Sequence, residues 1–332
     1  MPAGFGDVFA AAFRTWWRTL STTVPATLLV LVPAYVVAFA IQATIDAETL
    51  DEVFGTGNGD IDVDEDELVR AAIVVLISVL ITAIAQVVAF AVAFKAIVAG
   101  YAGARSDVRS TVSHGFARGG SAFWLAVLVF GAWLAVLLAA GFLTAVAAAV
   151  SGALAVLVGI VAFVGALVVF IWLGVSWSVA LPVVLVDEAR GRRALARSRE
   201  LVSGVWWQTF AILLVAVLAI GFGGFVIGFV VGIPFVAAES AVARAFGSNL
   251  SGVVSGTLST PLWAAFAVVL YFDFRFRKEG ITLDDAARSV GAERDASTHP
   301  LAPLADPAAP WRQAYPPPPP PTYPPPPDEP PR

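Results

Sequence analysis

Five long stretches of this chain contain no aspartate, glutamate, lysine or arginine, and they constrain the fold more than any other feature. They are residues 19–45, 71–94, 119–186, 201–238 and 245–272. One helical crossing of a bilayer takes about 20 residues, because the helix rises about 1.5 Å per residue through a hydrocarbon core about 30 Å thick. Four stretches therefore predict one crossing each. The third is far too long for a single helix and must fold back, which places a turn in "AAAVSGA" (147–153).

The sequence thus predicts an all-α, polytopic membrane protein with six transmembrane helices. Composition supports this class, because 58% of the residues are hydrophobic and only 14% are charged, whereas soluble domains average about 25% charged residues. The expected spans are 24–45, 70–95, 122–149, 153–182, 206–236 and 252–272.

The distribution of positive charge predicts the orientation of these spans. Every lysine and arginine except Arg70 and Arg244 belongs to the side that holds the N-terminus, the loops at 96–121 and 183–205, and the C-terminal tail. Cytoplasmic loops carry an excess of such residues. We therefore expect a multi-pass protein of the cell (inner or plasma) membrane with both termini in the cytoplasm.

Three regions are expected along the chain. Residues 1–22 predict an interfacial amphipathic helix, and 23–280 predict the six-helix transmembrane domain with an acidic extracytoplasmic loop at 46–68. Residues 281–332 predict a disordered, proline-rich cytoplasmic tail, whose "YPPPPPPTYPPPP" favours an extended polyproline II conformation. The tail is either a plain extension or a ligand for a proline-binding partner. Near its start, "TLDDAARSV" predicts a short helix with Thr282 as N-cap.

The segments that lead into the first, third and fifth spans resemble one another. "WWQTF" (206–210) echoes "WWRTL" (16–20), and "VSHGFARGGSAFW" (112–124) is a looser third version. This pattern predicts three units, each an interfacial helix followed by a transmembrane hairpin. Tryptophan also gathers at membrane interfaces without any repetition, so convergent anchoring is the alternative. In both cases the expected interface anchors are Trp16, Trp17, Trp206 and Trp207.

Charged residues around the third cytoplasmic segment and the end of the sixth span are the main candidate site. The arginine cluster predicts contact with anionic lipid headgroups, through Arg190, Arg192, Arg193, Arg197 and Arg199. At the end of the sixth span, "VLYFDFRFRKEG" (269–280) brings one aspartate and three cations after a long apolar run. We expect Arg275 to pair with Asp187 or Glu188, and Asp273 to pair with a nearby cation or with the arginine-rich third cytoplasmic segment. Arg277 is a further member of this charged group, and a plain cytoplasmic stop signal is the simpler interpretation.

Polar and glycine stripes inside the spans allow two interpretations each. Residues at helical spacing form two polar faces, Ser78–Thr82–Gln86 and Ser251–Ser255–Ser259. They either line a cavity or form hydrogen bonds between packed helices. Gly224, Gly228 and Gly232 predict close helix packing, either within one chain or between two copies.

Little in the sequence supports catalysis or a cofactor. The absence of cysteine excludes disulfides, thiolate metal sites and cysteine nucleophiles. The two histidines, His114 and His299, do not belong to a recognisable catalytic set. The acidic "NGDIDVDEDE" (58–67) offers oxygen ligands for calcium but lacks the glycine of an EF-hand loop, so a solvated loop is the simpler interpretation. No basic stripe with interleaved aromatic residues predicts nucleic-acid binding.

Two stretches together resemble a known family. "LPVVLVDEARGRRALARSRELVSGVWWQTF" (181–210) and "VLYFDFRFRKEG" (269–280) are similar to the membrane domain that accompanies some bacterial glycerophosphoryl diester phosphodiesterases and also occurs alone. The matching features are Pro182, Glu188, the "ALARS" of 194–198, and the spacing of Tyr271 to Gly280. The chain departs from the family at Arg199, where an aromatic residue is usual. Because the phosphodiesterase catalytic domain has no counterpart here, the resemblance implies a fold and no activity.

The expected function is therefore that of a non-enzymatic accessory or scaffold protein that engages lipid or a partner protein. A carrier or channel for a small or lipid-like solute is the alternative, with the two polar faces lining its path.

Overall fold

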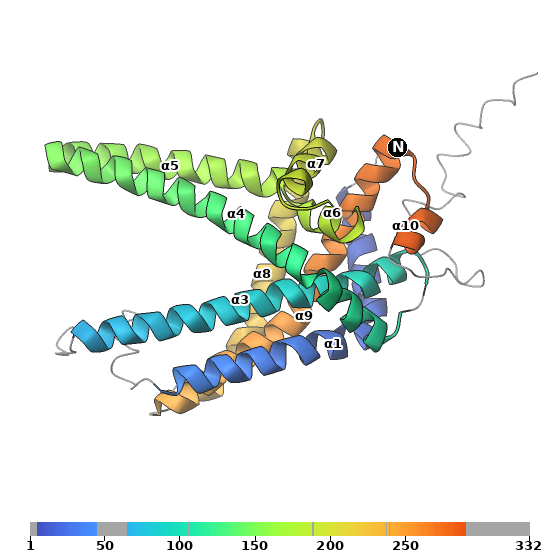
Figure 1. The fold of residues 1–332 in the computed structure, drawn as a ribbon, viewed down its shortest axis with the longest axis horizontal. Helices are drawn as coiled ribbons and strands as arrows, with labels where there is room; N and C mark the ends of the chain where they lie inside the picture. The colour runs from blue at the N-terminus through green and yellow to red at the C-terminus, as the bar shows by residue number, and fades with distance from the viewer. Residues whose placement is uncertain are drawn as a thin grey trace, which may run out of the picture.

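A computed structural model describes residues 5–44, 65–104, 106–187, 189–236, 238 and 240–289. Within these ranges the structure is built from helices, and six spans are long and apolar enough to cross a membrane (Figure 1). The long helices are α1 (Phe5–Gln42), α3 (Glu65–Tyr101), α4 (Val108–Val150), α5 (Gly152–Ser176), α8 (Trp206–Val236) and α9 (Ala241–Glu279). The predicted all-α class and the predicted count of six are confirmed.

Three short helices connect or follow the long ones. They are α6 (Ala180–Val186), α7 (Arg192–Val202) and α10 (Leu283–Ser289). The predicted N-cap of α10 is present, because the Thr282 hydroxyl accepts a hydrogen bond from the Asp285 backbone N–H at 3.3 Å and the Thr282 N–H donates to the Asp285 carboxylate at 2.8 Å. Residues 283–289 of the predicted disordered tail are therefore helical. Residues 290–332, with the polyproline segment and His299, lie outside the described residues.

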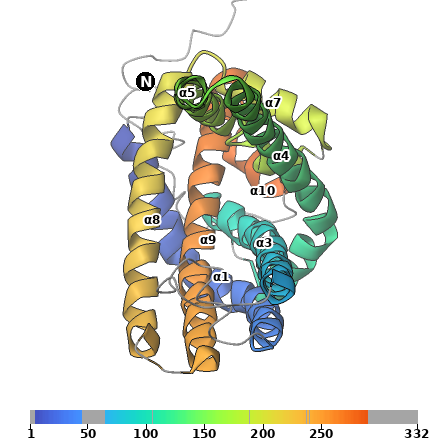
Figure 2. The ribbon, with the colours of Figure 1, turned by 90° about the vertical axis from the view of Figure 1, so that its left-hand side faces the viewer.

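The α1, α3 and α9 helices pack on one another and form the centre of the molecule. The α8 helix lies along α9, and α4 crosses α3 and then pairs with α5. Figures 1 and 2 show that the α4–α5 hairpin projects away from the other helices. Its turn falls where the sequence predicts it, because the Ser151 backbone N–H donates to Ala147 O and its hydroxyl accepts from the Leu154 N–H at 3.2 Å. One serine therefore ends α4 and begins α5.

The buried core lies at the end of the molecule that holds α6, α7 and α10. Its largest fully buried side chains include Phe94, Ile97, Leu185, Leu270 and Phe272. Large apolar side chains on the projecting α4–α5 hairpin are exposed, such as Phe130, Phe142 and Phe163. A bilayer solvates such side chains as well as a protein interior does, so only the polar end needs a conventional core.

Two predicted boundaries differ from the structure. The loop expected at 96–121 is short, because α3 continues to Tyr101 and α4 begins at Val108 with Asp107 as its N-cap. The helix continues through the glycines of "HGFARGG" because α4 packs there on α3. The helix expected to end at residue 22 continues without a break to Gln42.

The first helix bends along its length (Figure 1). Pro25 and Pro33 lie inside it, and proline removes one backbone hydrogen bond and clashes with the preceding turn. Four buried threonines donate their hydroxyl hydrogens to the carbonyl four residues earlier, a bond that also bends helices. They are Thr15, Thr19, Thr23 and Thr27. The bend therefore lets a single helix supply both the interfacial segment and the first span.

Candidate functional site

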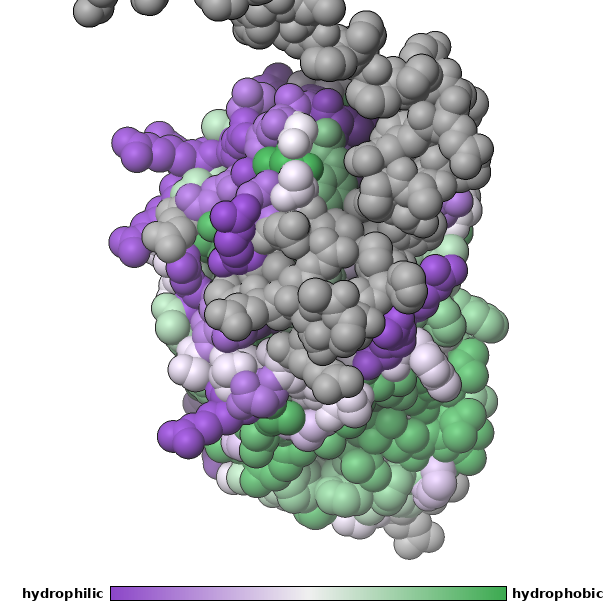
Figure 3. Space-filling model, turned by 90° about the vertical axis from the view of Figure 1, so that its right-hand side faces the viewer, coloured by the Kyte–Doolittle hydropathy of each residue, from purple (hydrophilic) through white to green (hydrophobic). Residues whose placement is uncertain are grey.

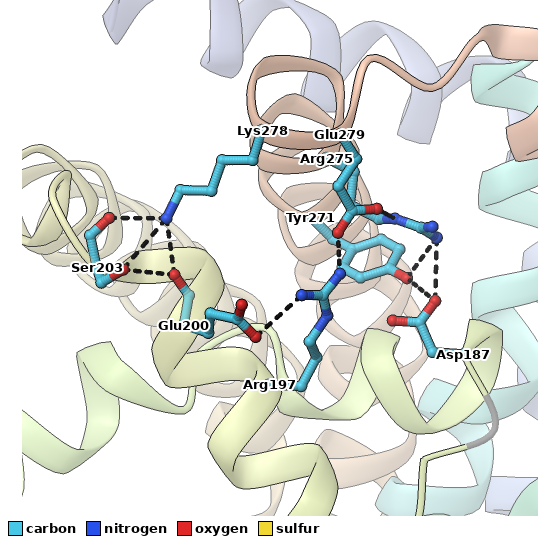
Figure 4. Close-up of polar contacts among 8 residues, drawn as sticks. All are labelled: Asp187, Arg197, Glu200, Ser203, Tyr271, Arg275, Lys278 and Glu279. Carbon is cyan, nitrogen blue, oxygen red and sulfur yellow. Dashed lines mark hydrogen bonds and ion pairs between the residues drawn. The ribbon is translucent and has the colours of Figure 1, made fainter.

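The end of α9 contacts the segment after α6 through an ionic network formed by Asp187, Arg197, Tyr271, Arg275 and Glu279 (Figure 4). Arg275 Nη1 lies 3.0 Å from Asp187 Oδ1, and its Nε lies 2.7 Å from Glu279 Oε2. The Tyr271 hydroxyl donates to the same Asp187 oxygen at 2.9 Å and accepts from Arg275 at 3.0 Å. One guanidinium therefore joins two carboxylates on different segments.

The same network holds α7 against α9. Arg197 of α7 forms an ion pair with Glu279 and a second with Glu200 at 3.0 Å. Lys278 donates to the backbone oxygens of Glu200 and Ser203 at 2.7 and 2.8 Å. The last carbonyls of a helix have no partner within the helix, so Lys278 caps the C-terminus of α7 (Figure 4).

The predicted charge pairs are placed as follows. Arg275 contacts Asp187, which is one of the two partners expected. Asp273 is nearly fully buried and pairs with Arg277 one turn later, with Arg277 Nε 3.0 Å from its Oδ1. Glu188, the other expected partner, lies outside the described residues.

The arginines predicted to meet lipid divide into two groups. Arg197 is held in the ionic network, and Arg199 lies over the Trp172 ring with its guanidinium carbon 5.0 Å from the ring centre. The other three, Arg190, Arg192 and Arg193, are exposed. On its other face α7 is buried, and Ser198 donates to Ser176 O at 2.9 Å. Arg190, just before α7, and Arg192 and Arg193 in its first turn form the basic surface of α7.

Figure 3 looks onto the end of the molecule where α9 terminates and shows hydrophilic side chains gathered over much of it, with apolar surface below. This is the end at which α7 and α10 pack on the core. This end therefore carries the charged side chains of α7 and of the end of α9, outside the apolar spans, as expected where helices leave the hydrocarbon of a membrane.

The four tryptophans expected as anchors also form two groups, one exposed and one packed against other residues. Trp17 and Trp207 are strongly exposed, as interface anchors should be. Trp16 instead points into the molecule, where its indole N–H donates to Leu258 O on α9 at 3.1 Å. Trp206 is half-buried and stacks on Phe210 with ring centres 5.6 Å apart. In each pair, one ring packs and its neighbour faces outward, because adjacent residues point about 100° apart around a helix.

Side chains of the two polar faces form hydrogen bonds within and between helices. Gln86 accepts from the Thr260 hydroxyl at 2.7 Å and donates to the Tyr35 hydroxyl at 3.4 Å. The Ser251 hydroxyl donates to Gly228 O on α8 at 3.1 Å. Ser78, Thr82 and Ser255 donate to carbonyls of their own helices, and Ser259 is half-buried. These contacts favour the packing interpretation.

The glycine stripe of α8 is only partly used for packing. A Cβ at Gly232 would lie 3.3 Å from Ser251 Oγ, whereas a Cβ at Gly224 or Gly228 would meet no described atom within 4 Å. Closer approaches occur at other glycines, including two on α9. A Cβ at Gly252 would lie 2.4 Å from the Tyr35 ring, and one at Gly256 would lie 2.7 Å from Gln86 Nε2. Their four-residue spacing in "SGVVSGT" was the sequence signal for this contact.

The acidic segment with a calcium interpretation lies mostly outside the described residues, which omit 45–64.

No protein-family model, no curated protein and no solved structure matches this chain.

Proposed function

We propose that this chain is a non-enzymatic component of the cell membrane that engages anionic lipid, or a partner protein of similar charge, through the basic surface of α7. The supporting observation is that the ionic network fixes α7 against the bundle while Arg190, Arg192 and Arg193 stay exposed. A guanidinium keeps its charge at every physiological pH and suits phosphate oxygens. Arg192 and Arg193 begin α7 and Arg190 precedes it by two residues, so three such groups lie close together in a surface suited to anionic headgroups.

We further propose that the chain is a stand-alone relative of the phosphodiesterase membrane domain. The two stretches that carry the resemblance are far apart in sequence, yet their residues Asp187, Tyr271 and Arg275 are in contact. A shared fold would explain why both motifs occur together. The proposed relationship does not imply phosphodiesterase activity for this chain.

The proposal requires that the basic surface of α7 faces the cytoplasm. A reporter that is active only in the cytoplasm should be active when fused after Arg332, and a reporter active only outside should be active when inserted near Asp62. Both results follow from an even number of spans and from the excess of lysine and arginine on one side. An exported C-terminus would overturn the orientation.

Replacing Arg190, Arg192 and Arg193 together by glutamine should weaken the preference of the protein for anionic lipid at least fivefold, and about a hundredfold if the three contributions add. Each cation near an anionic surface contributes about 1 kcal/mol. The preference can be measured by electron spin resonance, as the association of spin-labelled phosphatidylglycerol relative to phosphatidylcholine around the purified protein. The matched control replaces Arg70 and Arg244 by glutamine and should retain the preference, because these residues belong to the opposite side. An unchanged preference in the triple variant would reject the role of α7.

A further inference from the structure

Lys95 is a cation inside a membrane-spanning helix. It lies on α3 between the buried residues Phe94 and Ala96, and its own side chain is half-buried. It forms no hydrogen bond or ion pair with any residue that the structure describes. A half-buried cation inside a span is stabilised by a counter-charge, and an anionic ligand at this position would supply one.

The crossing of α4 over α3 brings two further basic residues to Lys95. The helices touch where a Cβ at Gly115 would lie 2.7 Å from the Val92 backbone, and Lys95 is three residues after Val92 on α3. His114 is next to Gly115, and Arg118 follows one turn later on α4. The His114 ring is within electrostatic range of both Lys95 and Arg118.

The histidine supplies a second unsatisfied group at this crossing. His114 Nε2 is buried and has no hydrogen-bond partner among the described residues. Buried polar atoms in proteins nearly always have partners, including bound ligands and water. Asp107, the N-cap of α4, is within electrostatic range of Lys95, and its carboxylate already accepts a hydrogen bond from the Ser110 N–H at 3.1 Å. The crossing therefore has positive charge and an unused hydrogen-bonding atom.

Apolar surface continues from this crossing along both helices. Beyond it, α4 diverges from α3 (Figure 1), and large apolar side chains on the two helices are exposed, among them Leu80, Ile84, Val127 and Phe130. An inorganic anion has no apolar part that could contact this surface, whereas the acyl chains of a lipid would cover it. Charge at one end and apolar walls beyond it match the two parts of a phospholipid.

We propose that the α3–α4 crossing is a specific site for an anionic phospholipid. Lys95, His114 and Arg118 bind its phosphate, and its acyl chains lie along the diverging faces of α3 and α4. Basic pockets between transmembrane helices on the cytoplasmic side bind phosphorylated headgroups in this manner. The site does not involve the basic surface of α7, so variants of Lys95 and variants of that surface distinguish it from the proposed function.

Native mass spectrometry of the full-length protein, with added phosphatidylglycerol or phosphatidylcholine, tests the site. The wild-type protein should retain phosphatidylglycerol in preference, with about fivefold weaker retention in Lys95→Gln, the change that loss of one cation contributing about 1 kcal/mol produces. Lys95→Arg should preserve retention. Arg70→Gln, on the same helix at its opposite end, should behave as wild type.

Three outcomes would overturn the proposal. They are equal retention of the two lipids by the wild type, unchanged retention in Lys95→Gln, or displacement of phosphatidylglycerol by millimolar inorganic phosphate, which would indicate a site for a free anion. The wild-type comparison remains decisive even if Lys95→Gln does not fold. Loss of retention in the triple variant of Arg190, Arg192 and Arg193 with Lys95→Gln unaffected would place the lipid at α7 instead.

Discussion

Gly115→Val should destabilise the protein severely, by about 3 kcal/mol or more in the free energy of unfolding. A Cβ at this position would lie 2.2 Å from Val92 Cγ2 and 2.7 Å from both Val92 N and Val92 Cα. The methyl group can rotate away, but the backbone of α3 cannot move without separating the two helices. Overpacking of a tight contact typically costs about 1–3 kcal/mol, and more where backbone must shift.

The matched control is Gly120→Ala, five residues further along the same helix. No described atom lies within 4 Å of a Cβ at this position, and alanine favours a helix over glycine by about 1 kcal/mol in water. Thermal unfolding of the two variants in the same detergent, followed by tryptophan fluorescence, should therefore show a large decrease for Gly115→Val and none for Gly120→Ala. Similar midpoints for both variants would contradict the close packing of α4 on α3.

Arg275→Asp should lower the free energy of unfolding by about 2–3 kcal/mol. The substitution places a third carboxylate beside Asp187 and Glu279, which Arg275 joins in the native protein. Breaking one partner of a buried ion pair costs about 3–5 kcal/mol, and the pair here is partly screened because the side chains of Arg275 and Asp187 are 19% and 22% exposed. The loss should be accompanied by faster trypsin cleavage within α7, because that helix is held by the same network.

The reciprocal swap separates a specific pair from a general loss of charge. Asp187→Arg alone should destabilise the protein, and the double variant with Arg275→Asp should recover part of the loss as a measurable coupling energy. Arg288→Asp is the control, because that arginine is 75% exposed in its pair with Asp285 and exposed pairs contribute about 0–1 kcal/mol. Strictly additive effects at positions 187 and 275 would show that the network does not act as a unit.

Features that depend on local sequence were predictable here. The number of spans follows from the lengths of charge-free stretches, because a bilayer requires a helix of fixed length with all its backbone groups bonded. The hairpin turn at Ser151 and the cap at Thr282 follow from side chains that bond to their own backbone a few residues away. Neither depends on a distant partner.

Features that depend on which helix faces which were not predictable. The glycine stripe of α8 looked like the principal packing motif, yet closer approaches occur at other glycines, among them Gly115, Gly252 and Gly256. A glycine motif shows that a close approach is sterically allowed, but the opposing surface decides whether it occurs. The same reason explains why Trp16 bonds to α9 while Trp17 faces outward.

By itself, then, the order of apolar and charged residues determined that this chain crosses a membrane six times, since lipid acts on each segment separately and responds only to its length and polarity. Only the tertiary structure decided that Arg275 meets Asp187, that α7 is fixed by Lys278 and Glu279, and that Gly115 of α4 packs on Val92 of α3. Those contacts join residues whose distance along the chain carries no information about their distance in space. The way in which the helices cross and pack sets these contacts.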